Sequence, residues 1–165
     1  MSCGQRSQVA LGLILAQDAD LLILDDFSMG LDPGYRRLFI DYLREYARTK
    51  NKTIFTTSHI VQDLERLIDD VIILDKHKVV VQSSVSDFVQ SFNRFDFDLT
   101  DETIELKKDA FIVNIELVRN KVELYTFSAE AEVLSYLERE QIRFTGLKQV
   151  KMKLEDAFIG LTGKY

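Results

Sequence analysis

The sequence is poor in cysteine, proline and long apolar runs. Its 165 residues contain one cysteine, one proline and no tryptophan. A single cysteine, Cys3, excludes an internal disulfide, which agrees with the cytosol as the compartment. The longest apolar stretch, 9–16, is far shorter than the roughly 20 residues of a membrane-spanning helix. No basic segment precedes it, so we expect no signal peptide.

Basic residues are also fewer than acidic residues. The 21 Lys and Arg residues are outnumbered by 27 Asp and Glu residues, which gives a net charge of −6. No basic stripe with interleaved aromatic residues offsets this balance, so nucleic acid is not expected as the main partner. A hydrophobic content of 46% with 29% charged residues is typical of a folded globular chain. The length suits one medium domain or two small ones.

The most informative stretch is 21–26, in which four apolar residues lead directly into Asp25 and Asp26. A fully apolar run of this length is typical of a strand buried on both faces, in a parallel sheet covered by helices. Ligands of such sheets bind beyond the carboxyl ends of the strands. One carboxylate there can hold Mg²⁺ and a second can align a water molecule. The alternative is an ordinary strand end with a solvated acidic turn.

A helix is expected over the apolar stretch 9–16, with Ser2 and Gln5 forming a capping box at its start. Because this helix is apolar nearly all round, we expect it to be buried. Its amino terminus can bind an anion through free N–H groups and the helix dipole. A plain N-cap is the alternative at this position.

Further elements follow the acidic strand. Asp32 can cap a helix that has Pro33 at its first position. The apolar stripe of that helix is expected to pack in the core; it consists of Tyr35, Phe39, Tyr42, Leu43 and Tyr46. A strand over 53–57 would place Ser58 and His59 on the same rim as Asp25, provided that the two strands are parallel.

A helix with Val61, Leu64 and Ile68 on one face leads to a third strand over 71–74. This alternation of strands and helices is typical of a parallel α/β sheet. A tight turn at 76–78 then predicts an antiparallel hairpin with 79–82. We assign no function to His77 in that turn. Ser86 is expected to cap a short helix that ends near Phe92.

The pattern changes near Asn93, and a smaller α+β unit is expected over 94–165. Its expected strands cover 95–99, 103–106, 111–118, 122–127 and 142–150. One helix is expected to open at Ser128, and a final helix from Leu154 to stop at Gly160 or Gly163. This unit contains no histidine, cysteine or glycine-rich loop.

Four segments resemble the motifs of ABC-type ATPases in their usual order across 1–92. Residues 2–6 (Ser-Cys-Gly-Gln-Arg) resemble the signature loop, 21–25 the Walker B strand, and 28–32 the D-loop. His59 matches the switch histidine. The ending from Leu154 is similar to the carboxyl-terminal extension of bacterial exporter-type ABC ATPases. The resemblance implies the fold class: an α/β fold in which 1–92 form a partial P-loop-type parallel sheet, the carboxyl-terminal half of an ABC ATPase domain, and 94–165 a small α+β extension.

The resemblance also implies a mechanism in which ATP lies between two ATPase domains arranged head to tail. Asp25 would help to hold Mg²⁺, Asp26 would take the place of the catalytic carboxylate, and His59 would contact the γ-phosphate. The remaining residues that match family motifs are Ser2, Gly4 and Gln5 of the signature loop, acting in trans, and Ser28 and Asp32 of the D-loop.

The partners that the resemblance implies are a second ATPase domain and an integral-membrane permease. It further implies a cytoplasmic location, peripheral at the inner face of the cell membrane, and ATP hydrolysis coupled to export.

Three features depart from the family pattern. Asp26 stands where glutamate is usual, Cys3 replaces the second signature glycine, and no G-x-x-x-x-G-K-[ST] sequence occurs. We therefore expect the chain to be the carboxyl-terminal portion of an ATPase, with a missing part before Met1, and to be inactive by itself. One alternative is a non-catalytic, degenerate ATPase half that donates a signature loop or acts as a regulatory module. A related DNA-repair or chromosome-structure ATPase is another.

Overall fold

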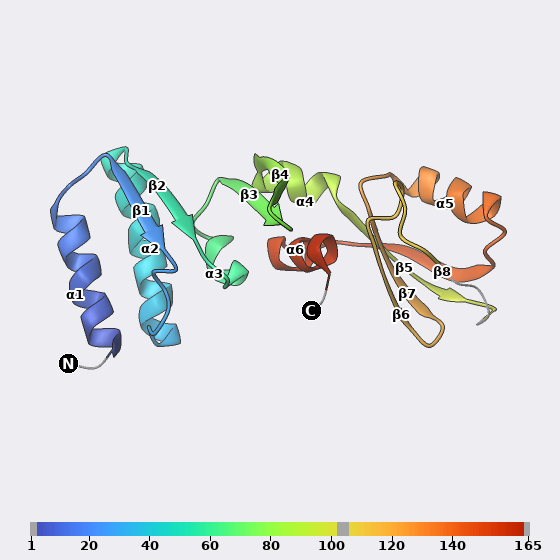
Figure 1. Cartoon of the computed structure of the whole chain (residues 1–165), viewed down its shortest axis with the longest axis horizontal. Helices are drawn as coiled ribbons and strands as arrows, with labels where there is room; N and C mark the ends of the chain where they lie inside the picture. The colour runs from blue at the N-terminus through green and yellow to red at the C-terminus, as the bar shows by residue number, and fades with distance from the viewer. Residues whose placement is uncertain (1–2, 102–105, 164–165) are drawn as a thin grey trace. The chain divides into compact units, whose positions relative to one another are not determined.

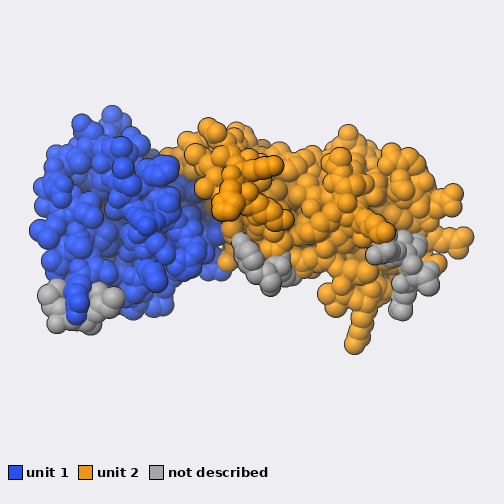
Figure 2. Space-filling view, in the orientation of Figure 1, with its two compact units in different colours: residues 1–68 blue, residues 69–165 orange. Residues whose placement is uncertain are grey.

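The computed structural model of the chain describes residues 3–101 and 106–163. The chain divides into two compact units, Met1–Ile68 and Asp69–Tyr165 (Figure 2). The sequence instead predicts domains over 1–92 and 94–165, and that division stays a prediction. The mixed α/β fold class is confirmed. No helix among the described residues is both long and apolar enough to cross a membrane.

Unit 1 consists of a parallel strand pair with helices packed on it (Figure 1). Its elements are α1 (Cys3–Ala16), β1 (Leu21–Asp25), α2 (Pro33–Lys50), β2 (Thr53–Thr57) and α3 (Val61–Leu64). The predicted strands over 21–25 and 53–57 and their parallel pairing are confirmed. The third helix is shorter than predicted. It ends at Leu64, so Ile68, which was expected on its apolar face, lies outside it.

The core of unit 1 forms on one face of the strand pair. Leu22 and Leu24 of β1 are buried there with Leu11 of α1 and with Ile40 and Leu43 of α2. Burying a leucine or isoleucine side chain contributes roughly 1.5–3 kcal/mol. Because side chains alternate along a strand, Leu22 and Leu24 lie on the same face of β1, and the helices pack on that face.

The expectation that β1 is buried on both faces is wrong for the described residues. Leu21 and Ile23 are 52% and 68% exposed, and Phe55 of β2 is 55% exposed. The expectation that α1 is buried is also wrong, since Val9 and Leu13 are exposed. The physical reason is the same in both cases. An apolar pattern shows which side chains gain from burial, but a second layer has to be present to bury them.

Helix α2 begins as its sequence predicts. The Asp32 carboxylate accepts hydrogen bonds from the N–H groups of Gly34 and Tyr35, both at 3.1 Å, and Pro33 occupies the first turn. At the other end, Asn51 adopts the left-handed conformation with φ 52°. Such a cap satisfies carbonyl groups in the last helical turn.

The tyrosine stripe of α2 does not pack as expected. Leu43 is fully buried, and Phe39 and Tyr46 pack against the core, but Tyr35 and Tyr42 are 53% and 52% exposed. The buried arc of α2 is centred on Ile40 and Leu43. The two exposed tyrosines lie at the edge of that arc.

In its described residues, unit 2 combines a hairpin with a four-stranded sheet and three helices (Figure 1). Its elements are β3 (Asp70–Asp75), β4 (Lys78–Ser84), α4 (Val85–Ser91), β5 (Asn93–Leu99), β6 (Asn114–Val118), β7 (Lys121–Thr126), α5 (Glu130–Arg139), β8 (Phe144–Val150) and α6 (Leu154–Thr162). The sheet has the order β6-β7-β5-β8 and is antiparallel throughout. The predicted α+β organisation of this part is therefore present.

The hairpin of β3 and β4 corrects one expectation and confirms another. Its tight turn is present, with Lys76 and His77 at φ 46° and 64°. Among the described residues, however, β3 pairs with β4 and does not extend the β1–β2 pair. A strand that returns after a two-residue turn finds its hydrogen-bond partner locally, at little loop-closure cost. Ser84, not Ser86, caps α4 by accepting the N–H of Asp87.

The sheet of unit 2 has two packed faces. Phe95, Phe97 and Leu99 of β5 alternate into a core that also contains Val133 and Leu137 of α5. On the opposite face, the ring of Tyr125 stacks against Phe92 and lies against Gly160 of α6. Helix α6 ends at Gly163, with φ 86°, as the sequence allowed. The predicted strand over 103–106 falls largely on residues outside those described.

Candidate functional site

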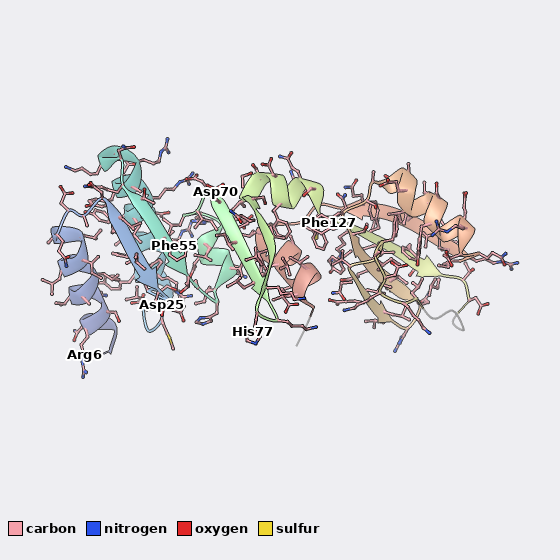
Figure 3. All side chains as sticks on the ribbon, turned by 45° about the horizontal axis from the view of Figure 1, so that its top comes forward. Arg6, Asp25, Phe55, Asp70, His77 and Phe127 are labelled. Carbon is pink, nitrogen blue, oxygen red and sulfur yellow. The ribbon has the colours of Figure 1, made fainter. Side chains whose placement is uncertain are left out.

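The parallel register of β1 and β2 brings the two strand ends together. Asp25 pairs with Thr57, the last residue of β2. The Thr57 hydroxyl donates a hydrogen bond to Oδ1 of Asp25. Figure 3 labels Asp25 at the end of β1 and Phe55 on the neighbouring strand. The carboxyl ends of both strands therefore form one rim, as expected for parallel strands.

Asp26 leaves the strand in a left-handed conformation, with φ 46°. Its N–H donates to the carbonyl oxygen of Thr57 at 3.0 Å and approaches the Thr57 hydroxyl at 3.3 Å. Aspartate is one of the few residues that adopt this conformation readily, because its short polar side chain can bond locally. These bonds turn the carboxylate of Asp26 toward the segment that follows β2.

The Asp26 carboxylate meets His59 there. Oδ2 of Asp26 lies 2.8 Å from Nδ1 of His59, and the contact is an ion pair when the imidazole is protonated. Ser58 lies between β2 and this histidine, and its hydroxyl accepts the N–H of Ile60 at 3.0 Å. Asp25, Asp26 and His59, three residues that the sequence singles out, thus lie on one rim.

Two polar atoms near this rim are buried without a partner among the described residues. They are Oδ1 of Asp26 and the hydroxyl oxygen of Ser28, whose residue is only 2% exposed. A buried polar atom without a hydrogen bond costs free energy unless a ligand or water supplies one. These two atoms, beside the contact between Asp26 and His59, make this rim the candidate ligand site.

The donor set fits a magnesium ion that is shared with phosphate. The described residues form no cluster of three or more His, Cys, Asp or Glu side chains able to hold a metal by themselves. Asp25 and Asp26 provide two carboxylates, and Mg²⁺ is commonly held by one or two carboxylates together with substrate phosphates and water. A free-standing metal centre does not fit, whereas a metal bound with a nucleotide does.

The other predicted site residues that the structure describes are Gly4 and Gln5 at the start of α1, and Ser28 and Asp32 in the segment 28–32. A Cβ atom built on Gly4 would lie 3.0 Å from the carbonyl oxygen of Gly30, so the first turn of α1 approaches this segment closely. Both Gly4 and Gln5 lie in that turn. Ser2 lies outside the described residues. The Asp32 carboxylate is engaged in capping α2, so its observed bonds are structural.

Unit 2 contains a shallow pocket of about 350 Å³ that holds none of the predicted site residues. Phe111 and Tyr136 stack in its wall with ring centroids 4.6 Å apart, and Arg139 lies over the Tyr136 ring. Burial raises the pKa of Tyr136. The N–H of Ile112 donates to Asp109 and lowers the pKa of that carboxyl group. These contacts pack the wall of the pocket within unit 2.

Sequence reasoning missed Thr57. The signal was available, because the parallel pairing of 21–25 with 53–57 puts the last residue of one strand beside the last of the other. A hydroxyl at that position can reach a carboxylate across the strand pair. The resemblance directed attention to His59, two residues further on.

No family model matches the chain, but many curated proteins do. One of them is an uncharacterized ABC transporter ATP-binding protein, YhcH, of Bacillus subtilis (strain 168). This chain is 29% identical to it over 164 residues, and the alignment covers 99% of this chain and 54% of that protein. The chain is 27% identical over 171 residues to Nod factor export ATP-binding protein I of Rhizobium sp. (strain N33), with the same two coverages. A thiamine import ATP-binding protein, ThiQ, of Jannaschia sp. (strain CCS1) is 36% identical over 89 residues, 54% of this chain and 39% of that protein.

The chain spans about half the length of the curated relatives that match it from end to end. Their shared description agrees with the resemblance drawn from the motif order in 1–92, and with the carboxylates and histidine gathered on the rim of the parallel strand pair. The homologues of this chain are ABC transporter ATP-binding proteins.

Proposed function

We propose that this chain is the carboxyl-terminal portion of an ABC transporter ATPase subunit, which couples ATP hydrolysis to export through a separate permease. One observation carries the proposal: the 2.8 Å contact between Asp26 and His59, on the rim that also holds Asp25. Two carboxylates and a histidine at the ends of parallel strands are suited to phosphoryl transfer, which depends on positioning and electrostatics.

Each residue on the rim has a role in this proposal. Asp25, held on one oxygen by Thr57, would hold Mg²⁺ with its other oxygen. A metal ion bound there with ATP would supply positive charge that offsets the negative charge of the phosphates. Asp26 would orient the attacking water, and His59, 64% exposed, is free to contact a γ-phosphate. Asp26 is shorter than the usual glutamate, so the placement of its backbone decides where its carboxylate lies.

The same proposal gives roles to the first turn of α1. Ser2, Gly4 and Gln5 would act in trans on the nucleotide of a second ATPase domain, and Ser28 and Asp32 would lie at the interface between the two domains. Within the chain, Gly4 lies close to the carbonyl of Gly30, so the two proposed segments are packed against each other. An integral-membrane permease is the third component, with the ATPase peripheral at the cytoplasmic face of the membrane.

Export is favoured over import by the extent of the matches. The Nod factor export protein aligns with 99% of this chain, whereas the thiamine import protein aligns with 54% of it. The shorter match, 89 residues, is close to the length of the proposed ATPase portion, 1–92. Residues 94–165 would then form the carboxyl-terminal extension.

A second candidate function follows from two substitutions in the motifs. Cys3 in the signature segment and Asp26 at the catalytic position are the changes expected in a degenerate, non-catalytic half that only donates its signature loop to an active partner. Such a half would associate with another ATPase without hydrolysing ATP at its own site.

The experiment compares this chain with the complete ATPase that contains it. We expect steady-state Mg-ATP hydrolysis by the complete protein and none above a buffer blank by the 165-residue chain, because no phosphate-binding loop sequence is present in it. Failure of the complete protein to hydrolyse ATP would favour the signature-donor function. Hydrolysis by the isolated chain would contradict the assignment of its roles.

A further inference from the structure

The Thr57 hydroxyl contacts both acidic residues of the rim. It donates to Oδ1 of Asp25, and its oxygen lies 3.3 Å from the backbone nitrogen of Asp26. A threonine hydroxyl has one proton, and an ionised carboxylate can only accept. The proton therefore points to Asp25, and the oxygen is left to accept the N–H of Asp26. One side chain at the end of β2 orders two neighbouring residues at the end of β1.

This arrangement has a consequence for each carboxylate. Since Oδ1 of Asp25 is held by Thr57, the carboxylate is fixed in rotation and its other oxygen is presented to a ligand. Asp26 has a left-handed backbone with φ 46°, a conformation that most side chains disfavour. The N–H of Asp26 bonds to the carbonyl and hydroxyl of Thr57, which holds that conformation in place.

We propose that Thr57 is a positioning residue of this site: its hydroxyl orients the Asp25 carboxylate toward the metal ion and thereby sets the affinity for the metal–nucleotide complex. The inference rests on the proposed function. Groups that hydrogen-bond to metal ligands fix ligand orientation, and their loss typically lowers metal affinity by about 10- to 100-fold. Thr57 would not touch the nucleotide and acts only through Asp25 and Asp26.

The chain offers closely matched variants for a test. Thr57→Val keeps the shape and removes the hydroxyl, and Thr57→Ser keeps the hydroxyl. Because Thr57 is exposed in a strand, and valine favours strands, Thr57→Val is expected to fold. Thr53→Val makes the same change in the same strand and on the same face, at the end opposite Asp25.

The measurement is Mn²⁺ binding to the complete ATPase in the presence of a non-hydrolysable ATP analogue, followed by electron paramagnetic resonance. For Thr57→Val we expect the Mn²⁺ dissociation constant to rise by about 10- to 100-fold. Thr57→Ser and Thr53→Val are expected to keep the wild-type value. Far-UV circular dichroism reports whether each variant is folded, and Thr57→Ala replaces Thr57→Val if that variant is unfolded.

An unchanged Mn²⁺ dissociation constant in folded Thr57→Val, with Mn²⁺ bound normally by the wild type, would overturn the role of Thr57 and leave the proposed function intact. An equal loss in Thr57→Ser would also overturn it, since serine retains the hydroxyl. A wild-type protein that binds no Mn²⁺ with the analogue and hydrolyses no ATP would refute the proposed function itself.

Discussion

Gly160 allows helix α6 to pack directly on the sheet of unit 2. A Cβ atom at this position would lie 2.3 Å from Cδ1 and 2.4 Å from Cε1 of Tyr125. Carbon atoms in contact are normally about 3.5–4.0 Å apart. The Gly160→Ala variant therefore forces either the helix or the tyrosine to move by more than about 1 Å.

Tyr125 has little freedom to move. Its residue is 3% exposed, its hydroxyl donates to Glu123 at 3.0 Å, and its ring stacks on Phe92 with centroids 6.2 Å apart. Overpacking a core typically costs about 1–3 kcal/mol, and an approach of 2.3 Å to a confined ring places this cost in the upper part of the range, at about 2–3 kcal/mol. Alanine in place of glycine within a helix gains about 1 kcal/mol. We expect Gly160→Ala to destabilise the packing of α6 by about 1–2 kcal/mol.

Hydrogen exchange followed by mass spectrometry measures this effect in the whole chain. A loss of about 1–2 kcal/mol corresponds to exchange on the order of 5- to 30-fold faster in peptides from α6 and β7. The matched control is Gly12→Ala, in α1, where an added Cβ meets nothing within 4 Å. That change is expected to slow exchange in α1. Unchanged or slower exchange in α6 of Gly160→Ala would refute the packing argument.

Three further predictions concern stability and association. Asp32→Ala removes the cap of α2 and should lower the free energy of unfolding by about 0.5–2 kcal/mol in urea titrations, whereas Asp32→Asn should restore most of it. The pKa of Asp109 is lowered in the folded state by the N–H of Ile112, so its stabilising effect is present above the ordinary value of 3.8 and is lost as the pH falls through the lowered pKa. The difference in urea midpoint between wild type and Asp109→Asn should therefore be present at pH 7 and shrink below about pH 4; a pH-independent difference would contradict this cause. The isolated chain should self-associate through the exposed face that carries Leu21 and Ile23, and Ile23→Thr should weaken this association in light scattering; a wild-type chain that stays monomeric at high concentration would contradict it.

The strand ends that carry the candidate site could be predicted from sequence because the signals are local. An apolar run followed by two carboxylates defines β1, and Asp32 with Pro33 defines the start of α2. The parallel pairing follows from the alternation of strands and helices, and it places His59 beside Asp26. These features depend on residues near one another in the chain or on one simple topological rule.

Other features could not be predicted, because they depend on what packs against each element. The sequence shows that Leu21 and Ile23 are apolar, but not that the described residues leave them uncovered. It shows three serines over 83–86, but which of them caps α4 depends on where the hairpin strand β4 ends. The bond from Thr57 to Asp25 joins residues 32 positions apart. It is visible only once the strand register is known.

The most direct test of the assignment is steady-state Mg-ATP hydrolysis by the complete ATPase carrying Asp26→Asn or His59→Ala. Asp26→Asn keeps the size of the side chain and removes its charge, and His59→Ala removes the partner of the 2.8 Å contact. The control is His77→Asn, which changes the other histidine, in the β3–β4 turn, to a residue that accepts its φ of 64°.

We expect each of the two rim variants to lose most of the hydrolysis, on the order of 100-fold or more, while His77→Asn keeps the wild-type rate. Retention of ATP binding in both variants would show that the loss lies in the chemical step. Hydrolysis that survives both Asp26→Asn and His59→Ala would contradict the assignment of this rim as the catalytic site.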